Sequence, residues 1–165
     1  DDRTIDQGLG FVRMMWDNGL AHRDIKPANV MARDGDLYLI DMSFGQVRPS
    51  AWREAVDLAN MMLVLALRST APHVYELATR HFTPDEIAEA FAATSGVTVP
   101  GQLKDKIAAD HRDLIAEFKS LAPARPPVPI QRWTLRRIGL AVFLVAVATM
   151  ILVLGIGNLD GIGLL

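Results

Sequence analysis

Apolar residues near the start of the chain recur at helical spacing. From Ile5 to Trp16 they stand three or four positions apart, which predicts a helix over about Thr4 to Leu20 with one apolar face. Asn18 and Gly19 form a typical helix end, because both residues tolerate the left-handed backbone that closes a final turn. The first element is therefore predicted to be an amphipathic helix.

A polar, proline-containing stretch from Ala21 to Val30 follows, and it suits neither a helix nor a strand. Two short apolar runs come next, Val30–Arg33 and Leu37–Ile40, on either side of Asp34-Gly35. An Asp-Gly pair between two such runs is a strong signal for a tight β-hairpin. The pattern thus predicts helix, loop and hairpin in that order.

Three more helices are predicted before residue 122. An apolar run covers Ala51 to Arg68. A second helix begins after Thr83, which can cap it, with Glu86 in the position that completes a capping box, and Gly96 is expected to end it. A third amphipathic pattern extends from about Gly101 to Leu121 and is expected to form a single helix.

The last pattern along the chain is apolar on all sides. Four prolines between residues 123 and 129 predict a stiff, extended linker. Ile138 to Gly157 then contains twenty residues without a charge. A helix of that length spans about 30 Å, the thickness of the hydrocarbon core of a bilayer. A buried core helix would need a large domain around it, so a transmembrane helix is expected.

Charges around this segment predict its orientation. Four arginines precede it without an intervening acid, and the single acid Asp160 follows it. Because basic residues flank membrane spans on the cytoplasmic side, the preceding lobe is expected in the cytoplasm, attached to a membrane by one or more spans. The arginines are Arg125, Arg132, Arg136 and Arg137.

Composition excludes two classes of function. Lys and Arg total 17 against 19 for Asp and Glu, and this net charge of -2 gives no broad basic surface for a nucleic acid. The chain has no cysteine, so it forms neither disulfides nor thiolate metal sites. Candidate chemistry must therefore come from oxygen and nitrogen side chains.

Such side chains are concentrated in the polar loop, which reads His22-Arg23-Asp24-Ile25-Lys26-Pro27-Ala28-Asn29 and is followed after the hairpin by Leu39-Ile40-Asp41. Phosphoryl transfer concentrates negative charge, so it needs metal ligands, a cation and a carboxylate that orients or deprotonates the attacking hydroxyl. All of these residue types occur here within twenty positions.

The loop resembles the catalytic loop of the protein-kinase-like superfamily, H-R-D-x-K-x-x-N, at every specified position. The resemblance implies that Asp24 is the catalytic base and that Lys26 steadies the transferred phosphate of ATP. It also implies that Asn29 and Asp41 hold Mg²⁺. His22 and Arg23 would mainly support the loop.

Departures from the kinase pattern limit which members of the superfamily this chain resembles. Met42 stands where typical protein kinases have the Phe of Asp-Phe-Gly, and no Ala-Pro-Glu follows. Only fifteen residues separate Asp41 from Asp57, which lies near the start of an apolar helical run. This shortened lobe is more similar to atypical RIO-type kinases or to phosphotransferases that act on small molecules.

Other polar residues are expected to have structural roles. Asp57 is predicted to hydrogen-bond the backbone of the catalytic loop, as the equivalent helix residue does in the kinase family, with a solvent-facing carboxylate as the alternative. His73, His81 and His111 lack the spacing of metal ligands and are expected to be ordinary surface or half-buried histidines.

The expected fold class is α+β, a mostly helical kinase-like carboxy-terminal lobe with a small β-hairpin at the catalytic loop, followed by a transmembrane helix. The chain is interpreted as a fragment, because no residue from Asp1 to Leu20 could supply the nucleotide-covering loop and strand lysine of an amino-terminal lobe. The expected segments are a partial kinase-like domain at 1–122, a Pro/Arg-rich linker at 123–137, the membrane helix at 138–157 and the start of a further segment at 158–165.

The expected function is that of a membrane-anchored, ATP-dependent phosphotransferase, which uses Mg²⁺ and acts on a hydroxyl of a protein, a lipid or a small molecule. The alternative is a pseudokinase-like module that binds a nucleotide or a partner and regulates an attached membrane domain. A third hypothesis is that Ile138 begins a larger multi-span transporter or lipid-handling domain.

Overall fold

Helix α1, Asp2–Asp17, opens the fold in a computed structural model that describes residues 1–94, 98–126, 139–140 and 142–152. Asp1 caps the helix by accepting a hydrogen bond from the amide of Thr4 at 2.8 Å. Asn18 and Gly19 end it as predicted, Gly19 at a φ of 62°. Leu20, predicted as the last helical residue, instead begins a strand.

The predicted hairpin is present as β2, Val30–Arg33, and β3, Asp36–Leu39. Arg33 pairs with Asp36, so Asp34 and Gly35 alone form the turn, and both have positive φ, 54° and 81°. Two such residues match the twist of a two-residue hairpin.

A second antiparallel pair joins β1, Leu20–Ala21, to β4, Gln46–Val47. This pair was not predicted, because each strand has only two residues.

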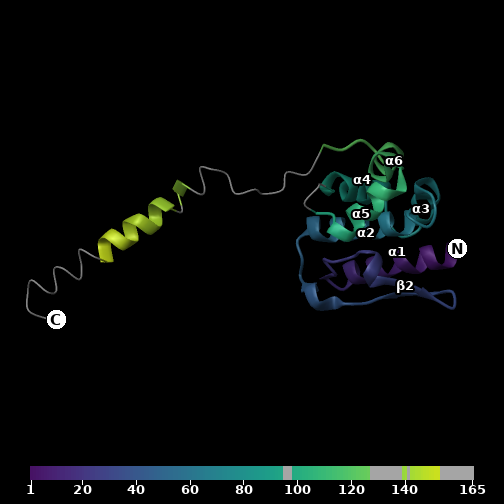
Figure 1. Cartoon of the computed structure of the whole chain (residues 1–165), viewed down its shortest axis with the longest axis horizontal. Coiled ribbons are helices and arrows are strands. Elements are labelled where there is room, and N and C mark those ends of the chain that lie inside the picture. The colour runs from purple at the N-terminus through teal and green to yellow at the C-terminus, as the bar shows by residue number, and fades with distance from the viewer. Residues whose placement is uncertain (95–97, 127–138, 141, 153–165) are drawn as a thin grey trace, which may run out of the picture. The chain divides into compact units, whose positions relative to one another are not determined.

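Helix α2, Ala51–Ala66, lies at the centre of the fold, and every residue in its last twelve positions is buried. Figure 1 shows α1 and the hairpin on one side of α2, with the later helices on the other side. Gly8 lets α1 come close, since a Cβ there would lie 3.3 Å from both Leu37 Cδ1 and Met61 Sδ. The predicted helix over Ala51–Arg68 is thus confirmed, with an end two residues earlier.

Four shorter helices complete the lobe: α3 at Ala71–Ala78, α4 at Pro84–Ala93, α5 at Gly101–Asp110 and α6 at Leu114–Leu121. The capping box of Thr83 and Glu86 is confirmed at the start of α4. That helix ends at Ala93, and Gly96, the residue expected to end it, lies outside the described residues.

The prediction of one helix over Gly101–Leu121 is wrong. His111 has a φ of 63°, which ends α5, and Asp113 then caps α6 by accepting from the amide of Ala116 at 3.0 Å. Between them, Arg112 donates to the carbonyl of Ser69 at 2.8 Å and so holds the break against the end of α2. The helix α3 was also missed by the sequence analysis.

The described residues of the first unit, 1–129, form an α+β fold that is mostly helical, as expected. A second unit covers 130–165, and its described residues, 139–140 and 142–152, are helical. Among the described residues, no helix is both long enough and apolar enough to cross a membrane. The rest of the predicted membrane helix, at 138, 141 and 153–157, and the linker residues 127–137 lie outside the described part of the chain.

Candidate functional site

A buried carboxylate from α2 holds the start of the polar loop. Asp57 is 1% exposed, and it accepts hydrogen bonds from the amide of His22 at 2.5 Å and from the amide of Arg23 at 3.0 and 3.2 Å. The predicted structural role of Asp57 is therefore confirmed. Burial raises the pKa of Asp57 to about 7, although the two amides act in the opposite direction by favouring the ionised form.

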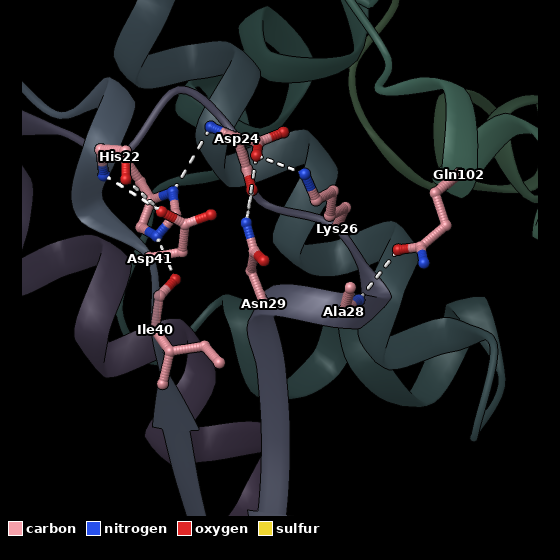
Figure 2. A network of polar contacts seen from close by, with 9 residues as sticks. His22, Asp24, Lys26, Ala28, Asn29, Ile40, Asp41 and Gln102 are labelled. Carbon is pink, nitrogen blue, oxygen red and sulfur yellow. Dashed lines mark hydrogen bonds and ion pairs between the residues drawn. The ribbon is translucent and has the colours of Figure 1, made fainter.

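His22 joins the loop to the end of the hairpin. Its ring is fully buried, its Nδ1 accepts from the amide of Asp24 at 3.3 Å, and its Nε2 lies 3.0 Å from the carbonyl oxygen of Ile40. Because Nδ1 accepts and the Ile40 carbonyl can only accept, the proton of a neutral ring belongs on Nε2. The supporting role expected for His22 has a physical basis in this bridge, which Figure 2 shows.

Asp24, Lys26 and Asn29 form one network of direct contacts. Lys26 Nζ lies 2.5 Å from Asp24 Oδ2, and the side-chain amide of Asn29 donates to the same oxygen at 3.1 Å and to the carbonyl of Asp24 at 2.9 Å. The 3₁₀ turn Pro27–Asn29 places Asn29 opposite Asp24. In Figure 2 the amide oxygen of Asn29 is directed away from Asp24, so this oxygen is free to act as a ligand.

Asp41 reaches the site from the other side of the loop. The amide of Ile40 donates to the carbonyl of Asn29 at 2.9 Å, which continues the hairpin pairing, and Asp41 follows Ile40 directly, two residues after β3. The Asp41 carboxylate accepts from the hydroxyl of Ser43 at 2.5 Å and from its amide at 3.4 Å. The hydrogen bonds from Ser43 are the main reason that the pKa of Asp41 is lowered, and the charges of Lys26 and His22 lower it further. In the described chain, no direct hydrogen bond joins Asp41 to Asp24 or Asn29.

Two residues at the site have a backbone conformation that L-amino acids rarely adopt. Arg23 has a φ of 68° and Asp41 a φ of 64°. Such conformations cost on the order of 1–3 kcal/mol each and persist only where neighbouring contacts hold them. Asp57 holds Arg23 through its amide, and Ser43 holds Asp41. Two of the strained positions thus lie at the candidate site, and Asp34, Arg48 and His111 have positive φ outside it.

Two further contacts were not predicted. Gln102, at the start of α5, accepts from the amide of Ala28 at 2.9 Å and so supports the turn between Lys26 and Asn29 (Figure 2). Gln102 follows Ala28 by 74 positions, and no local pattern could indicate this contact. Ser43 was detectable in principle, because a Ser two residues after an Asp commonly closes a side-chain turn.

Two of the three remaining histidines contact single acids, and His111 is exposed, as expected for a surface histidine. His73 Nε2 lies 2.9 Å from Asp2, and His81 Nε2 lies 2.8 Å from Asp6. Within the described ranges, no group of three or more His, Asp or Glu side chains could hold a metal ion. A metal at the loop would therefore be held by the Asp41 carboxylate and the amide oxygen of Asn29. These two ligands together supply only one negative charge.

No protein-family model, no curated protein and no solved structure matches the chain.

Proposed function

We propose that this chain is the carboxy-terminal lobe of a membrane-anchored, ATP-dependent phosphotransferase of the protein-kinase-like superfamily. One observation carries the proposal: Lys26 and Asn29 both contact the carboxylate of Asp24, at 2.5 and 3.1 Å, on a loop whose backbone is held by the buried Asp57. A base, a cation and a neutral amide thus share one rigid site. The α+β fold supports the same proposal.

Asp24 is proposed as the residue that orients and deprotonates the acceptor hydroxyl. Its side chain is 15% exposed, so it can reach a ligand while its position stays fixed by Lys26 and Asn29. Lys26 is proposed to pair with the transferred phosphate. The acceptor is a hydroxyl on a protein, a lipid or a small molecule.

The oxygen atoms at the site fit Mg²⁺, which prefers carboxylate and amide oxygens and commonly uses few protein ligands together with substrate phosphates. Asn29 would contribute its amide oxygen, since its nitrogen is used by Asp24. Asp41 would contribute a carboxylate that is exposed and whose pKa is already low. Mg²⁺ and ATP, when bound, would supply charge neutralisation and the phosphoryl group.

The membrane anchor is proposed from residues 138–157. Most of the described large apolar side chains between Leu140 and Leu152 are more than half exposed, as expected for a helix whose apolar surface faces lipid, and Val147 is half-buried. The arginines before this segment favour a cytoplasmic lobe, where ATP is available.

A pseudokinase-like regulatory module is the second candidate function. The observation that favours it is the complete occupation of one Asp24 oxygen, because Oδ2 contacts both Lys26 and Asn29. A carboxylate used in this way stabilises the loop even if it never accepts a proton. In this candidate the lobe binds a nucleotide or a partner and regulates an attached membrane domain.

Two substitutions in the complete native polypeptide that contains this chain separate the candidates. Asp24→Asn should lower phosphotransfer by roughly two to four powers of ten, because it removes a general base, and should leave nucleotide binding largely intact. Asp41→Asn should weaken the binding of Mg²⁺ and nucleotide, because it removes a negative ligand. The two activities are measured by nucleotide titration and by transfer to lipid, small-molecule and protein acceptors.

Asp34→Asn is the matched control, because Asp34 lies in the exposed hairpin turn, where Asn also tolerates positive φ. It should change neither binding nor transfer. If the wild-type protein binds nucleotide, transfers to no acceptor class and behaves in cells as Asp24→Asn does, the enzyme proposal is excluded and the regulatory module is favoured.

A further inference from the structure

The segment between β3 and α2 exposes apolar side chains beside arginines that lack acidic partners. Phe44 is 58% exposed and Val47 is 71% exposed, although both belong to the large apolar residues that folded proteins usually bury. Arg48 follows Val47 directly, and in Figure 1 this segment, in blue, leads into α2.

The β1–β4 pair fixes this segment against the start of the catalytic loop. Val47 pairs with Leu20, and the amide of Arg48 donates to the carbonyl of Gly19 at 2.8 Å. Only Pro49 and Ser50 then separate Arg48 from α2. The exposed apolar side chains are therefore held on the fold by backbone bonds.

Two more arginines, Arg23 and Arg53, lie close to each other where α2 contacts the loop. Arg53 precedes Asp57 by four positions on α2, so both side chains lie on one face of the helix, and Asp57 binds the amide of Arg23 at 3.0 Å. Burial and then the charge of Arg23 lower the pKa of Arg53, which shows that the two cations feel each other. The guanidinium of Arg53 also lies 4.7 Å from the ring centre of Trp52.

In the described part of the chain, the nearby acids form no ion pair with these arginines. The carboxylate of Asp57 is buried and accepts hydrogen bonds from backbone amides, although its charge still acts on Arg23 and Arg53. Asp41 is hydrogen-bonded to Ser43. Burial raises the pKa of Glu54, and the charge that lowers it comes from Arg13. Among the described residues, Arg23, Arg48 and Arg53 form no ion pair, so their charge is available to an anionic partner.

We propose that Phe44, Val47, Arg48, Trp52, Arg53 and Arg23 form a patch that docks on an anionic lipid bilayer. Phe44 and Val47, which are exposed, insert into the boundary between headgroups and acyl chains, while Trp52 is half-buried against the core and contacts the guanidinium of Arg53. Each arginine near an anionic leaflet strengthens binding about fivefold. Charge complementarity selects lipid over a second copy of this chain, which would bring the same three arginines against each other. This inference goes beyond the proposed function and does not require phosphotransfer, but it rests on the proposed membrane anchor, which holds the lobe near the bilayer.

The test uses the absence of cysteine from the chain. Val47→Cys in the full chain carries a polarity-sensitive fluorophore, and the chain is reconstituted in nanodiscs of phosphatidylcholine alone or with one third phosphatidylserine. We expect a blue shift and quenching by spin-labelled lipid in the anionic discs, and much weaker effects in the neutral discs. The double variant Arg48→Gln and Arg53→Gln should lower the ratio of docked to undocked chains roughly 25-fold, because two positive charges are lost. The double variant Arg48→Lys and Arg53→Lys keeps both charges and should retain most of the docking.

Met14→Cys is the matched control, because Met14 is 55% exposed but its neighbour Arg13 is paired with Asp17 and Glu86. Its label should stay in water in both discs. The proposal is overturned if the Val47 label is not quenched in anionic discs, if the Gln variant is quenched equally, or if the Met14 label is quenched as strongly. A Val47 label that is shielded from water in detergent also overturns the proposal, because the patch is then covered by protein. This holds whether or not the shielding depends on protein concentration. Loss of the anchor would appear separately, as a chain that no longer copurifies with neutral discs.

Discussion

At the scale of single residues, the candidate site depends on one buried acid. Asp57 is surrounded by core residues of α2 and receives hydrogen bonds only from backbone amides, so its ionised form is favoured by those amides and disfavoured by burial. Burial is the larger effect, and it raises the pKa of Asp57 to about 7. The loop from His22 to Asn29 is therefore attached to the core by a group whose charge changes near neutral pH.

This shift predicts a pH dependence of stability. An acid whose pKa is higher in the folded state than the ordinary 3.8 binds a proton more tightly when folded, so its contribution to stability is full below about pH 4 and is lost as the pH rises to about 7. The free energy of unfolding should fall over this window by up to about 1.4 kcal/mol per pH unit from Asp57 alone.

Asp57→Asn isolates this contribution, because Asn has no proton to lose. The difference in unfolding free energy between wild type and Asp57→Asn, measured by urea denaturation and circular dichroism, should shrink from pH 4.5 to 7 and stay constant above that. A difference that does not change with pH would mean that the amides of His22 and Arg23 keep Asp57 ionised throughout.

The sequence pattern predicted which side chains of the loop act together, but not which distant residues contact the loop. The order His22, Asp24, Lys26 and Asn29 was sufficient to expect side chains that act together, since they lie within eight positions. Gln102 could not be found, because its contact with the loop depends on how α5 packs. The strained backbone of Asp41 was equally hidden, since nothing in its sequence neighbourhood requires a positive φ.

At the scale of elements, local signals were reliable where a helix start or turn is determined by neighbouring residues. The capping box of α4 is such a case: Thr83 accepts from the amide of Glu86 at 3.2 Å, and the Glu86 carboxylate accepts from the amide of Thr83 at 2.7 Å. The hairpin turn at Asp34-Gly35 is another. By contrast, the break between α5 and α6 is held by Arg112 against α2, and a helical spacing of apolar residues continues across it.

The capping box gives a prediction with an internal control. Thr83→Ala removes the side-chain acceptor of the Glu86 amide and should lower the free energy of unfolding by about 1 kcal/mol. Ser50→Ala at the start of α2 should have little effect, because Ser50 makes no side-chain capping bond. Both values come from thermal or urea unfolding of the full chain. Equal losses for the two variants would show that α4 does not need the cap.

At the scale of the whole molecule, the apolar residues belong to two different kinds of surface. Most of those in the first unit form one core, from Ile5 on α1 to Phe118 on α6, with exceptions such as Phe44 and Val47. Most of those described in the second unit, from Leu140 to Leu152, are exposed, and Val147 is half-buried. A shift from a one-sided to an all-round apolar pattern was visible in the sequence, and it predicted the division of the chain into a folded lobe and a separate helical segment.

The proposed anchor predicts a defined topology, which a chain without cysteine allows to be measured directly. Ser120→Cys, in the exposed end of α6, should react with a membrane-impermeant maleimide in inverted vesicles and not in intact cells, because arginines before the span keep the lobe cytoplasmic. Asn158→Cys should show the opposite pattern, because it follows the uncharged segment.

Replacing both Leu144 and Val145 by Arg should release the chain from membranes at alkaline pH, since each arginine at a helix centre costs roughly 3 kcal/mol on insertion. Labelling of both cysteines from the same side would exclude a single span, and retention of the double Arg variant would exclude residues 138–157 as the anchor.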